Sequence, residues 1–453
     1  MYYLTDISRA FGYPMPEVQI TGCGDLPSPF RVTELATESM AFAGAMLQRY
    51  IQADSGSPNP FSPLQIDRRL ASFWFDMTIR PQGWQLPSIW DAIAGNYQAA
   101  DGWIRLHTNA PHHRQAALSV LNCAEDRDAV QAKVRSWQAD QLEAEIVARG
   151  GCAATMRSLQ DWQQHPQGQA VRAEPLVHLQ TTHKQDVPEV TPDPARPLRG
   201  IRILDLTRVL AGPVAGRFLA AYGAEVLRID PPDWDEPGVI PEVVLGKRCA
   251  RMDLRQPAQL AQFKQLLADC DVLLHGYRPG ALDSLNLDEA TRRAINPAAI
   301  DVSLNAYGWS GPWSERRGFD SLVQMSNGIA HQGMLMAGAE KPWPLPVQAL
   351  DHATGYLLAA AVLHGLIRRR EAGEIIQAKL SLARTGELLV SRGHDNQPQP
   401  LAAETPDDLD PYIEHTDWGK AQRVKFPLHI GGCPAYWDYP ASYLGSSPAS
   451  WQG

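Results

Sequence analysis

The chain has 453 residues, which at roughly 100–200 residues per domain predicts two to three domains. Hydrophobic residues make up 44% of it and charged residues 20%, an ordinary globular composition that excludes a disordered or collagen-like protein. With 41 Lys and Arg against 50 Asp and Glu, the net charge of −9 argues against a nucleic-acid coat but leaves room for a local basic pocket.

The N-terminal sequence MYYLTDISRAFGY lacks a basic segment followed by an apolar core, so we expect no signal peptide. The most apolar stretch, residues 356–367, is too short to cross a bilayer. The six cysteines have no CxxC spacing and the 13 histidines no HExxH spacing, so we expect neither a disulfide framework nor a metal site. These features together predict a soluble, cytoplasmic protein with reduced thiols.

Near the N-terminus, residues 27–51 resemble residues 344–368, with prolines and an Ala-Thr pair at matching positions. Farther along, residues 65–71 resemble residues 377–383, after an insertion of five residues in the first copy. Self-similarity of this kind indicates duplication. The sequence therefore predicts that a partial copy of the later segment precedes it in the chain.

Residues 95–182 have the pattern of a small α+β module. Residues 97–108 (YQAADGWIRLHT) predict a hairpin that turns at Asp101-Gly102, a strong turn dipeptide. Helical patterns follow at 114–121, 126–137, 139–149 and 156–165. Residues 183–198 then hold four prolines and little periodicity, which predicts an extended linker.

After the linker, short apolar strands alternate with helical patterns. The predicted strands are 201–206, 224–229, 271–275 and 299–305, and the predicted helices between them are 214–222, 258–268 and 287–295. This alternation is typical of an α/β fold with a doubly wound, mainly parallel open sheet. The turn after the first strand, TRVLAGP, lacks the glycine spacing of a GxGxxG fingerprint, which disfavours a conventional NAD or FAD site.

Two acidic residues are candidates for chemistry. Asp351 lies at the start of a predicted helix, where composition alone favours a helix N-cap, although an ionised carboxylate there is also a potential nucleophile. Asp320 follows Arg316-Arg317, which is typical of a solvated charged loop. The functional alternative is an anion contact by Arg317 and a carboxylate near a substrate.

Seven segments, in order, resemble the class III coenzyme A transferases, the CaiB/BaiF family. They are GIRILDLTRVLAGP (200–213), AEVLRID (224–230), GKRCARMDL (246–254), YRPG (277–280), NAYGWSGP (305–312), RGFDSLVQMSNG (317–328) and PVQALDHATGYLLAAAVL (346–363). The family's usual order places the large-domain sheet first and the small domain second. Here the resemblance implies a permuted, partly duplicated order: a degenerate large-domain end (1–94), the small domain (95–182), the linker (183–198), a Rossmann-like large domain (199–390) and a returning tail (391–453).

The resemblance implies that Asp351 attacks a donor thioester, giving a mixed anhydride and then an aspartyl-CoA thioester. In the degenerate copy, Glu34 takes the position of Asp351, and we expect it to be a relic. The residues that the resemblance, together with their charge, assigns to coenzyme A or substrate binding are Arg208, Val209, Ala211, Lys247, Arg248, Gly276, Tyr277, Arg278, Arg317 and Asp320.

The implied activity is transfer of coenzyme A from an acyl-CoA donor to a carboxylic acid, with coenzyme A as a substrate. The implied assembly is a homodimer, because family members interlock, with each site between the large domain of one chain and the small domain of the other. One alternative is an acyl-CoA racemase, which Phe319 disfavours because family racemases carry a proton-transferring histidine at that position. The other is a non-catalytic CoA-binding paralogue.

Overall fold

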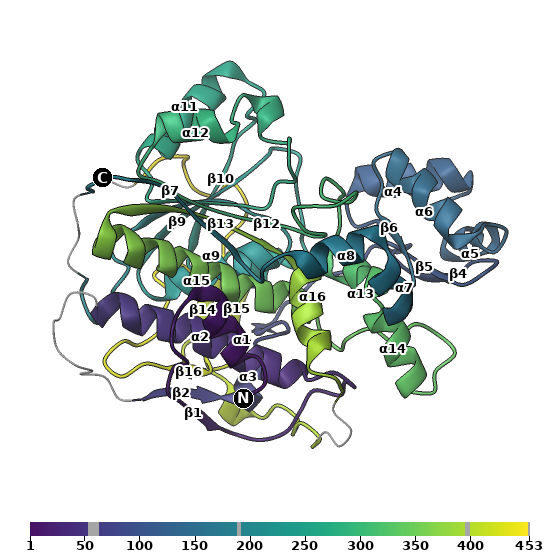
Figure 1. Cartoon of the computed structure of the whole chain (residues 1–453), viewed down its shortest axis with the longest axis horizontal. Coiled ribbons are helices and arrows are strands. Elements are labelled where there is room, and N and C mark those ends of the chain that lie inside the picture. Colours follow the sequence, from purple (N-terminus) through teal and green to yellow (C-terminus); the bar gives the residue numbers. More distant parts are fainter. Residues whose placement is uncertain (53–62, 188–191, 395–398, 452–453) are drawn as a thin grey trace.

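A computed structural model describes residues 1–52, 63–187, 192–394 and 399–451, so parts of the predicted repeat, linker and tail lie outside the described residues. At the centre of the fold is a seven-stranded sheet with helices on both faces, and a smaller module projects to one side (Figure 1). The prediction of a doubly wound, mainly parallel sheet beside a small α+β module is confirmed.

The central sheet runs in the order β10-β9-β8-β11-β12-β13-β7, and its strands are parallel except at the β13–β7 pair. The strands are β7 (His178–Lys184), β8 (Arg202–Leu206), β9 (Glu225–Asp230), β10 (Lys247–Arg251), β11 (Val272–His275), β12 (Ile300–Asn305) and β13 (Glu374–Ser381). The four predicted strands agree with β8, β9, β11 and β12. The apolar pattern missed β7, β10 and β13, because charged and polar residues interrupt all three.

Helices cover both faces of this sheet. One face carries α9 (Ala211–Ala221) and α15 (Ala349–Ala372), with α2 (Val32–Gln52) packed against α15, and the other face carries α11 (Pro257–Ala268) and α12 (Glu289–Ile295). Ile203 packs toward the first group and Leu204 toward the second, since successive strand residues point to opposite faces. By length and composition α15 could cross a membrane, but its apolar window is completely buried, as in the core helix of a globular protein.

The predicted duplication has a structural counterpart. Helix α2 is followed by β2 (Leu64–Asp67) and α3 (Arg68–Phe73), and α15 is followed by β13 and α16 (Leu382–Ser391), so both copies run helix, strand, helix. The two long helices pack against each other (Figure 1). Glu34 and Asp351 are each the third residue of their helix.

The N-terminal segment and the tail build two small sheets together. One has the order β1-β2-β16, and the other β14-β15-β3. Their remaining strands are β1 (Val18–Thr21), β3 (Ile79–Gln82), β14 (Glu414–Thr416), β15 (Gly419–Arg423) and β16 (Leu428–His429). The tail therefore returns to the core by forming these two sheets together with strands from residues 1–94.

The small module has a core of its own. It comprises β4 (Gly95–Gln98), β5 (Trp103–Leu106), β6 (Ala153–Thr155), α4 (Pro111–Leu121), α5 (Arg127–Val134) and α6 (Ala139–Ala148). The predicted helix at 156–165 is shorter: α7 (Leu159–Gln164) ends before Pro166, which opens α8 (Pro166–Ala173). The first two residues of the predicted linker belong to β7.

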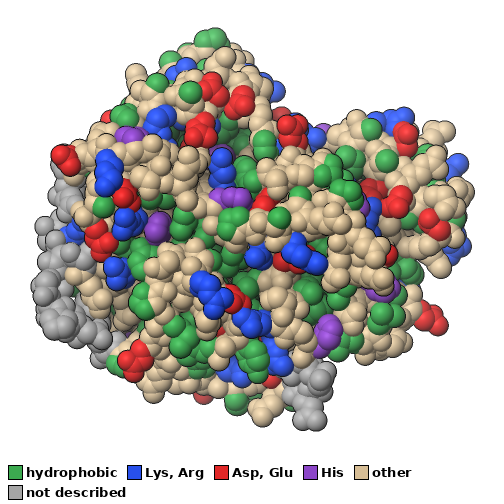
Figure 2. Space-filling model, viewed as in Figure 1, with side chains coloured by type: hydrophobic (Ala, Val, Ile, Leu, Met, Phe, Trp, Pro, Cys, Tyr) green, Lys and Arg blue, Asp and Glu red, His purple; other side chains and the backbone are tan. Residues whose placement is uncertain are grey.

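The other helices are α1 (Leu4–Phe11), α10 (Ile240–Val243), α13 (Asp320–Ser326) and α14 (Ile329–Met336), with 3-10 turns at Asp283–Leu285 and Pro406–Asp408. Lys, Arg, Asp and Glu side chains are interspersed over the face shown in Figure 2. On this face the acidic net charge is therefore not gathered into one patch.

Candidate active site

A cavity of about 240 Å³ lies at the carboxyl ends of β8 and β9, where doubly wound sheets bind their ligands. We call it the sheet-edge cavity; its walls include Arg208 from the turn after β8 and Tyr277 from the turn after β11. Arg208 donates a 2.6 Å hydrogen bond to the Tyr277 hydroxyl, and its guanidinium lies 4.8 Å from the ring centroid of Trp234. No described carboxylate pairs with Arg208, so its charge is available to an anionic ligand.

The turn after β8 is strained. Val209 has φ +64°, a left-handed conformation that is rare for a β-branched residue and costs of the order of 1–3 kcal/mol. Its N–H donates a 3.0 Å hydrogen bond to the Glu236 carboxylate, which helps to hold this conformation. Val209 and Glu236 line a second cavity, of about 220 Å³, together with Trp90, His107 and Phe319. We call it the junction cavity, because its walls come from both the sheet domain and the small module.

Asp351 is buried at the start of α15. Gly355, one turn later, lets this helix approach α9 closely: a Cβ there would lie 2.5 Å from the Ala211 carbonyl oxygen. The N-cap of α15 is Gln348, so the N-cap interpretation of Asp351 is wrong. No hydrogen bond to the Asp351 carboxylate is found among the described residues. This carboxylate is therefore held in place by packing and is left available for chemistry.

Asp320, the first residue of α13, lies beside Asp351. Its carboxylate accepts a 2.5 Å hydrogen bond from the Gln324 side chain and a 2.9 Å hydrogen bond from the backbone N–H of Asp351. Burial raises the pKa of Asp320 to about 6. Burial, the charge of Asp320 and the charge of Glu236 raise the pKa of Asp351 well above its usual range. Asp320 has hydrogen-bond donors that favour its ionised form, and Asp351 has none among the described residues, so ionisation is the less favourable at Asp351.

The small module faces this pair through one side of β5. Strand alternation places Trp103 and Arg105 on that side, with His107 just beyond the strand end. Trp103 packs in the apolar cluster that includes α13. His107 stacks on Phe319 with ring centroids 3.7 Å apart, and burial lowers the pKa of His107 well below its usual range. The same chain therefore supplies a small module to this site, whereas the resemblance implied one from a partner chain.

Of the predicted residues, Arg208 and Tyr277 line the sheet-edge cavity, and Val209 lines the junction cavity. Ala211, Asp320 and Asp351 are buried and line neither cavity, although the charge of Glu236, in the junction-cavity wall, raises the pKa of Asp351. Gly276 and Arg278 are exposed on the turn beside Tyr277. Arg317 is also exposed and donates a 3.2 Å hydrogen bond to the Gly150 carbonyl of the small module.

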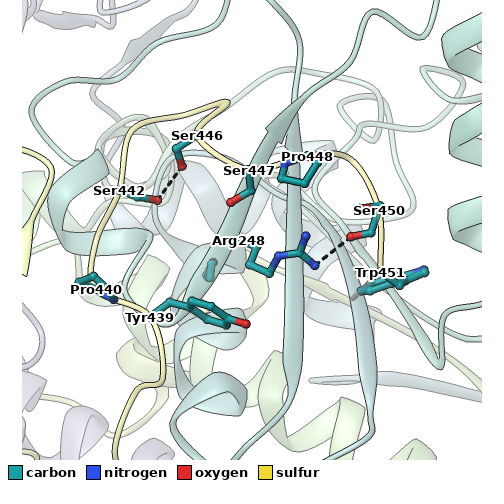
Figure 3. Close-up of a pocket in the computed structure, with 10 residues that line it drawn as sticks. Arg248, Tyr439, Pro440, Ser442, Ser446, Ser447, Pro448, Ser450 and Trp451 are labelled. Carbon is teal, nitrogen blue, oxygen red and sulfur yellow. Dashed lines mark hydrogen bonds between the residues drawn. The ribbon is translucent and has the colours of Figure 1, made fainter. Parts of the chain in front are cut away.

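Lys247 and Arg248 are elsewhere. Lys247 is buried in an ion pair with Asp205, with 2.9 Å between Nζ and Oδ2. Arg248 pairs with Glu225 and donates a 2.8 Å hydrogen bond to the Ser450 carbonyl, in a pocket formed with the C-terminal tail (Figure 3). Neither lines the sheet-edge or the junction cavity. In this structure the charges of Lys247 and Arg248 are paired with the carboxylates of Asp205 and Glu225.

Sequence reasoning missed Arg105, His107 and Glu236. The alternation of WIRLH in the predicted hairpin places Arg105 and His107 on one face, and this signal could have found them. Glu236 follows a strand by several loop residues, and no local pattern indicates that it faces Asp351.

Comparison with known proteins finds similarity to one family over part of the chain. Residues 198–404 match the model of CoA-transferase family III. A probable fatty acyl-CoA transferase of Mycobacterium tuberculosis is 32% identical, over 47% of this chain and 59% of its own length. The succinyl-CoA:glutarate CoA-transferase of Mus musculus is 34% identical, over 41% of this chain and 45% of its own length. The chain thus spans about half the length of the curated relatives it matches.

Solved structures resemble the chain over a similar share. The crystal structure of the M. tuberculosis protein Rv3272 has 33% sequence identity and a TM-score of 0.40, covering 44% of this chain and 56% of that one. A CAIB/BAIF family protein from Brucella suis has 26% identity and a TM-score of 0.37, covering 49% and 65%.

Proposed function

Since residues 198–404 of this chain belong to CoA-transferase family III, we propose that the protein moves coenzyme A from an acyl-CoA donor to a carboxylic acid, with Asp351 as nucleophile. The observation that carries the proposal is the buried Asp351 carboxylate, which has no hydrogen-bond donor among the described residues and lies beside Asp320. Burial and a neighbouring negative charge destabilise the ionised form, so the carboxylate that does ionise is a stronger nucleophile than a solvated one.

The chemistry balances in two exchanges. The Asp351 carboxylate attacks the thioester carbonyl, and the C–S bond breaks. The CoA thiolate is released, and a mixed anhydride forms between Asp351 and the donor acid. The thiolate then attacks the aspartyl carbonyl, which releases the donor acid and forms an aspartyl-CoA thioester. The acceptor carboxylate attacks the aspartyl carbonyl of that thioester, the C–S bond breaks, and a second mixed anhydride forms. The released thiolate attacks the acceptor's carbonyl in this anhydride, which gives the acceptor's CoA thioester and frees the Asp351 carboxylate. Each step needs the thiolate to stay bound nearby, because its return is otherwise a bimolecular event.

The overall reaction is tested with the whole chain. Succinyl-, acetyl- and propionyl-CoA are each mixed with a panel of free acids, and new acyl-CoA species are identified by mass spectrometry. Formation of the acceptor's CoA thioester at the expense of the donor supports the proposal. If only hydrolysis of the donor, or no reaction, is found with every pair, the proposal is wrong.

We predict that Arg208→Met raises the KM for acyl-CoA roughly 10- to 100-fold and leaves the KM for the acid unchanged. Arg208 has no described carboxylate partner, and a hydrogen bond to a charged group contributes about 1.5–3 kcal/mol. Arg255→Gln is the matched control: Arg255 lines the same cavity but is exposed and paired with Asp253 at 2.7 Å. Steady-state kinetics with both substrates varied makes the comparison, and equal effects of the two variants would contradict this role for Arg208.

We predict that Asp320→Asn moves the acidic limb of the pH profile of kcat/KM to lower pH. The charge of Asp320 raises the pKa of Asp351, so its removal allows the nucleophile to ionise at lower pH. Glu236→Gln acts in the same direction but by less, because Glu236 has the smaller influence on the Asp351 pKa. If the acidic limb of the kcat/KM profile lies at the wild-type pH in both variants, ionisation of Asp351 does not determine the position of that limb.

His107 supports a second candidate, the exchange of an α-proton of an acyl-CoA. Phe319 cannot transfer a proton, but the neutral imidazole of His107 stacks on it and lines the junction cavity. The test is incubation with one enantiomer of a 2-methylacyl-CoA in D2O. If the wild type incorporates deuterium at the α-carbon and the His107→Gln variant does not, this candidate is favoured. If the wild type incorporates no deuterium, this candidate is excluded.

A further inference from the structure

A third cavity, of about 830 Å³, is lined mainly by residues of the small module. We call it the basic cavity, because four cations line it: Arg105, Arg127, Arg135 and Lys341. Two acids also line it, Asp91 and Asp128, and Asp91 is already paired with Arg114. The cavity therefore has an excess of positive charge, although the chain as a whole is acidic.

The cations of this cavity have no acidic partner among the described residues. Within the described part of the chain none of the four forms an ion pair. Arg105 donates only to the Asn96 side chain, at 3.0 Å, and its Nε is buried without a partner. Arg127 donates to the Ala94 carbonyl at 3.1 Å. Arg127, Arg135 and Lys341 are exposed, whereas Arg105 is partly buried. An unpaired guanidinium is costly to bury, and burial lowers the pKa of Arg105 to about 10.

Aromatic rings hold the two guanidinium groups in place. Arg105 lies 4.7 Å from the ring centroid of Trp90, and Arg127 lies 5.3 Å from that of Tyr97. A guanidinium fixed by a ring keeps its planar fork of N–H donors directed at a carboxylate or phosphate, and less entropy is lost on binding. The arrangement thus has the features of an oxyanion site.

The basic cavity adjoins the proposed reaction centre. It shares Ser88, Trp90 and Asp91 with the junction cavity, and Arg105 lies on the same face of β5 as His107. The charge of Arg105 also reaches Asp320, whose pKa it lowers against the larger effect of burial. The basic cavity therefore adjoins the junction cavity, whose wall residue Val209 follows the sheet-edge cavity's Arg208 in the chain.

From this geometry we propose that Arg105 and Arg127 bind a second anionic group on the acid substrate, remote from the carboxyl group that reacts. The group is an oxyanion, a carboxylate or a phosphonate-like head, and its acid enters the junction cavity with the reacting end toward Asp351. This inference rests on the proposed function. It adds a subsite that selects doubly charged acids over singly charged acids of equal length.

The kinetic test compares glutarate, valerate and 4-phosphonobutyrate as acceptors in the wild type, Arg105→Met and Arg127→Met. We expect the KM for glutarate to rise about tenfold or more in each variant, and the KM for valerate to stay within twofold. A parallel rise with 4-phosphonobutyrate shows that any oxyanion is accepted, and a rise with glutarate alone restricts the subsite to carboxylates. Arg149→Met is the control, because Arg149 is on the surface of the same module and paired with Glu145. Equal changes for glutarate and valerate, or none, would overturn the proposal.

A binding measurement separates this inference from the proposed function. Glutarate is titrated into the CoA-free chain by calorimetry, which requires no transferase activity. Binding that is weakened about tenfold in Arg105→Met or Arg127→Met, but not in Arg149→Met, supports the subsite even if no CoA transfer is found. Active transfer to valerate with no glutarate binding would overturn the subsite and leave the proposed function intact. If Arg105→Met does not fold, as judged by circular dichroism, Arg127→Met carries both tests.

Discussion

Asp351→Asn should lower the rate of CoA transfer by roughly a thousandfold or more, because an amide cannot form the anhydride. The variant should fold normally, since the Asp351 carboxylate makes no hydrogen bond among the described residues and is not the N-cap of α15. The measurement is the initial rate of acceptor-CoA formation, with circular dichroism as the check on folding. Substantial activity in a folded Asp351→Asn protein would remove Asp351 from the mechanism.

The same variant should be more stable than the wild type near neutral pH. The folded state raises the pKa of Asp351, so ionisation of this group favours unfolding once the pH exceeds the unfolded pKa, about 3.9. Asparagine removes that penalty, and the gain in melting temperature should vanish as the pH falls toward 4. Such a trade of stability for activity is expected at a site where a charge is held in unfavourable surroundings.

Glu34→Gln is the matched control for Asp351→Asn. Glu34 occupies the corresponding position in α2, but its carboxylate is 3.0 Å from the guanidinium of Arg68, which also pairs with Asp25. An acid engaged in this way does not serve as a nucleophile, so transfer should continue in Glu34→Gln at close to the wild-type rate. Loss of transfer in this variant would give the first copy a catalytic role.

Glu242→Ala is expected to cost about 3–5 kcal/mol of unfolding free energy, because it leaves the buried guanidinium of Arg217 without a counter-charge and that of Arg423 with Glu414 alone. Glu242 pairs with Arg217 from α9 and with Arg423 from β15, and it accepts hydrogen bonds from the backbone and hydroxyl of Thr78. This one carboxylate thus ties together the N-terminal segment, the sheet domain and the tail. Urea unfolding of both proteins measures the difference, and a loss below about 1 kcal/mol would contradict the expectation.

The pH dependence of this contribution has a definite sign. Burial opposes ionisation of Glu242, but the charges of Arg217 and Arg423 outweigh it and lower its pKa to about 2. The stabilisation is therefore present above the unfolded pKa of about 4.3 and is lost as the pH falls toward 2. Glu145→Gln provides the contrast, because the exposed Glu145–Arg149 pair contributes about 0.3–0.5 kcal/mol.

Local patterns were sufficient for most of the central sheet. β8, β9, β11 and β12 are covered on both faces, so apolar residues predominate in them and make them recognisable, although Asp205, Arg228 and Asp301 lie inside three of them. β10 was missed because Lys247 and Arg248 open it, and their partners Asp205 and Glu225 are 42 and 23 residues away in the chain. The charge of such a residue is visible in the sequence, but the group that neutralises it is not.

In the candidate site too, contacts between residues far apart in the chain could not be predicted from local sequence. Resemblance identified Asp351 and placed Asp320 near it, whereas composition favoured an N-cap and a solvated loop. The contact itself joins residues 31 positions apart and depends on how α13 meets α15. Arg105 and His107 come from the other side of the site, through a strand of the small module. Only the packing of that module on α13 shows that they face Asp320.

The most direct test of the central claim is to trap the aspartyl intermediate. The chain is incubated with an acyl-CoA donor and no acceptor, quenched with hydroxylamine, digested and analysed by mass spectrometry. The account predicts a hydroxamate on Asp351, dependent on acyl-CoA and absent from Asp351→Asn. If the same protein preparation transfers CoA once an acceptor is supplied, but the trapping experiment leaves Asp351 unmodified or places the hydroxamate on another residue, the account is contradicted.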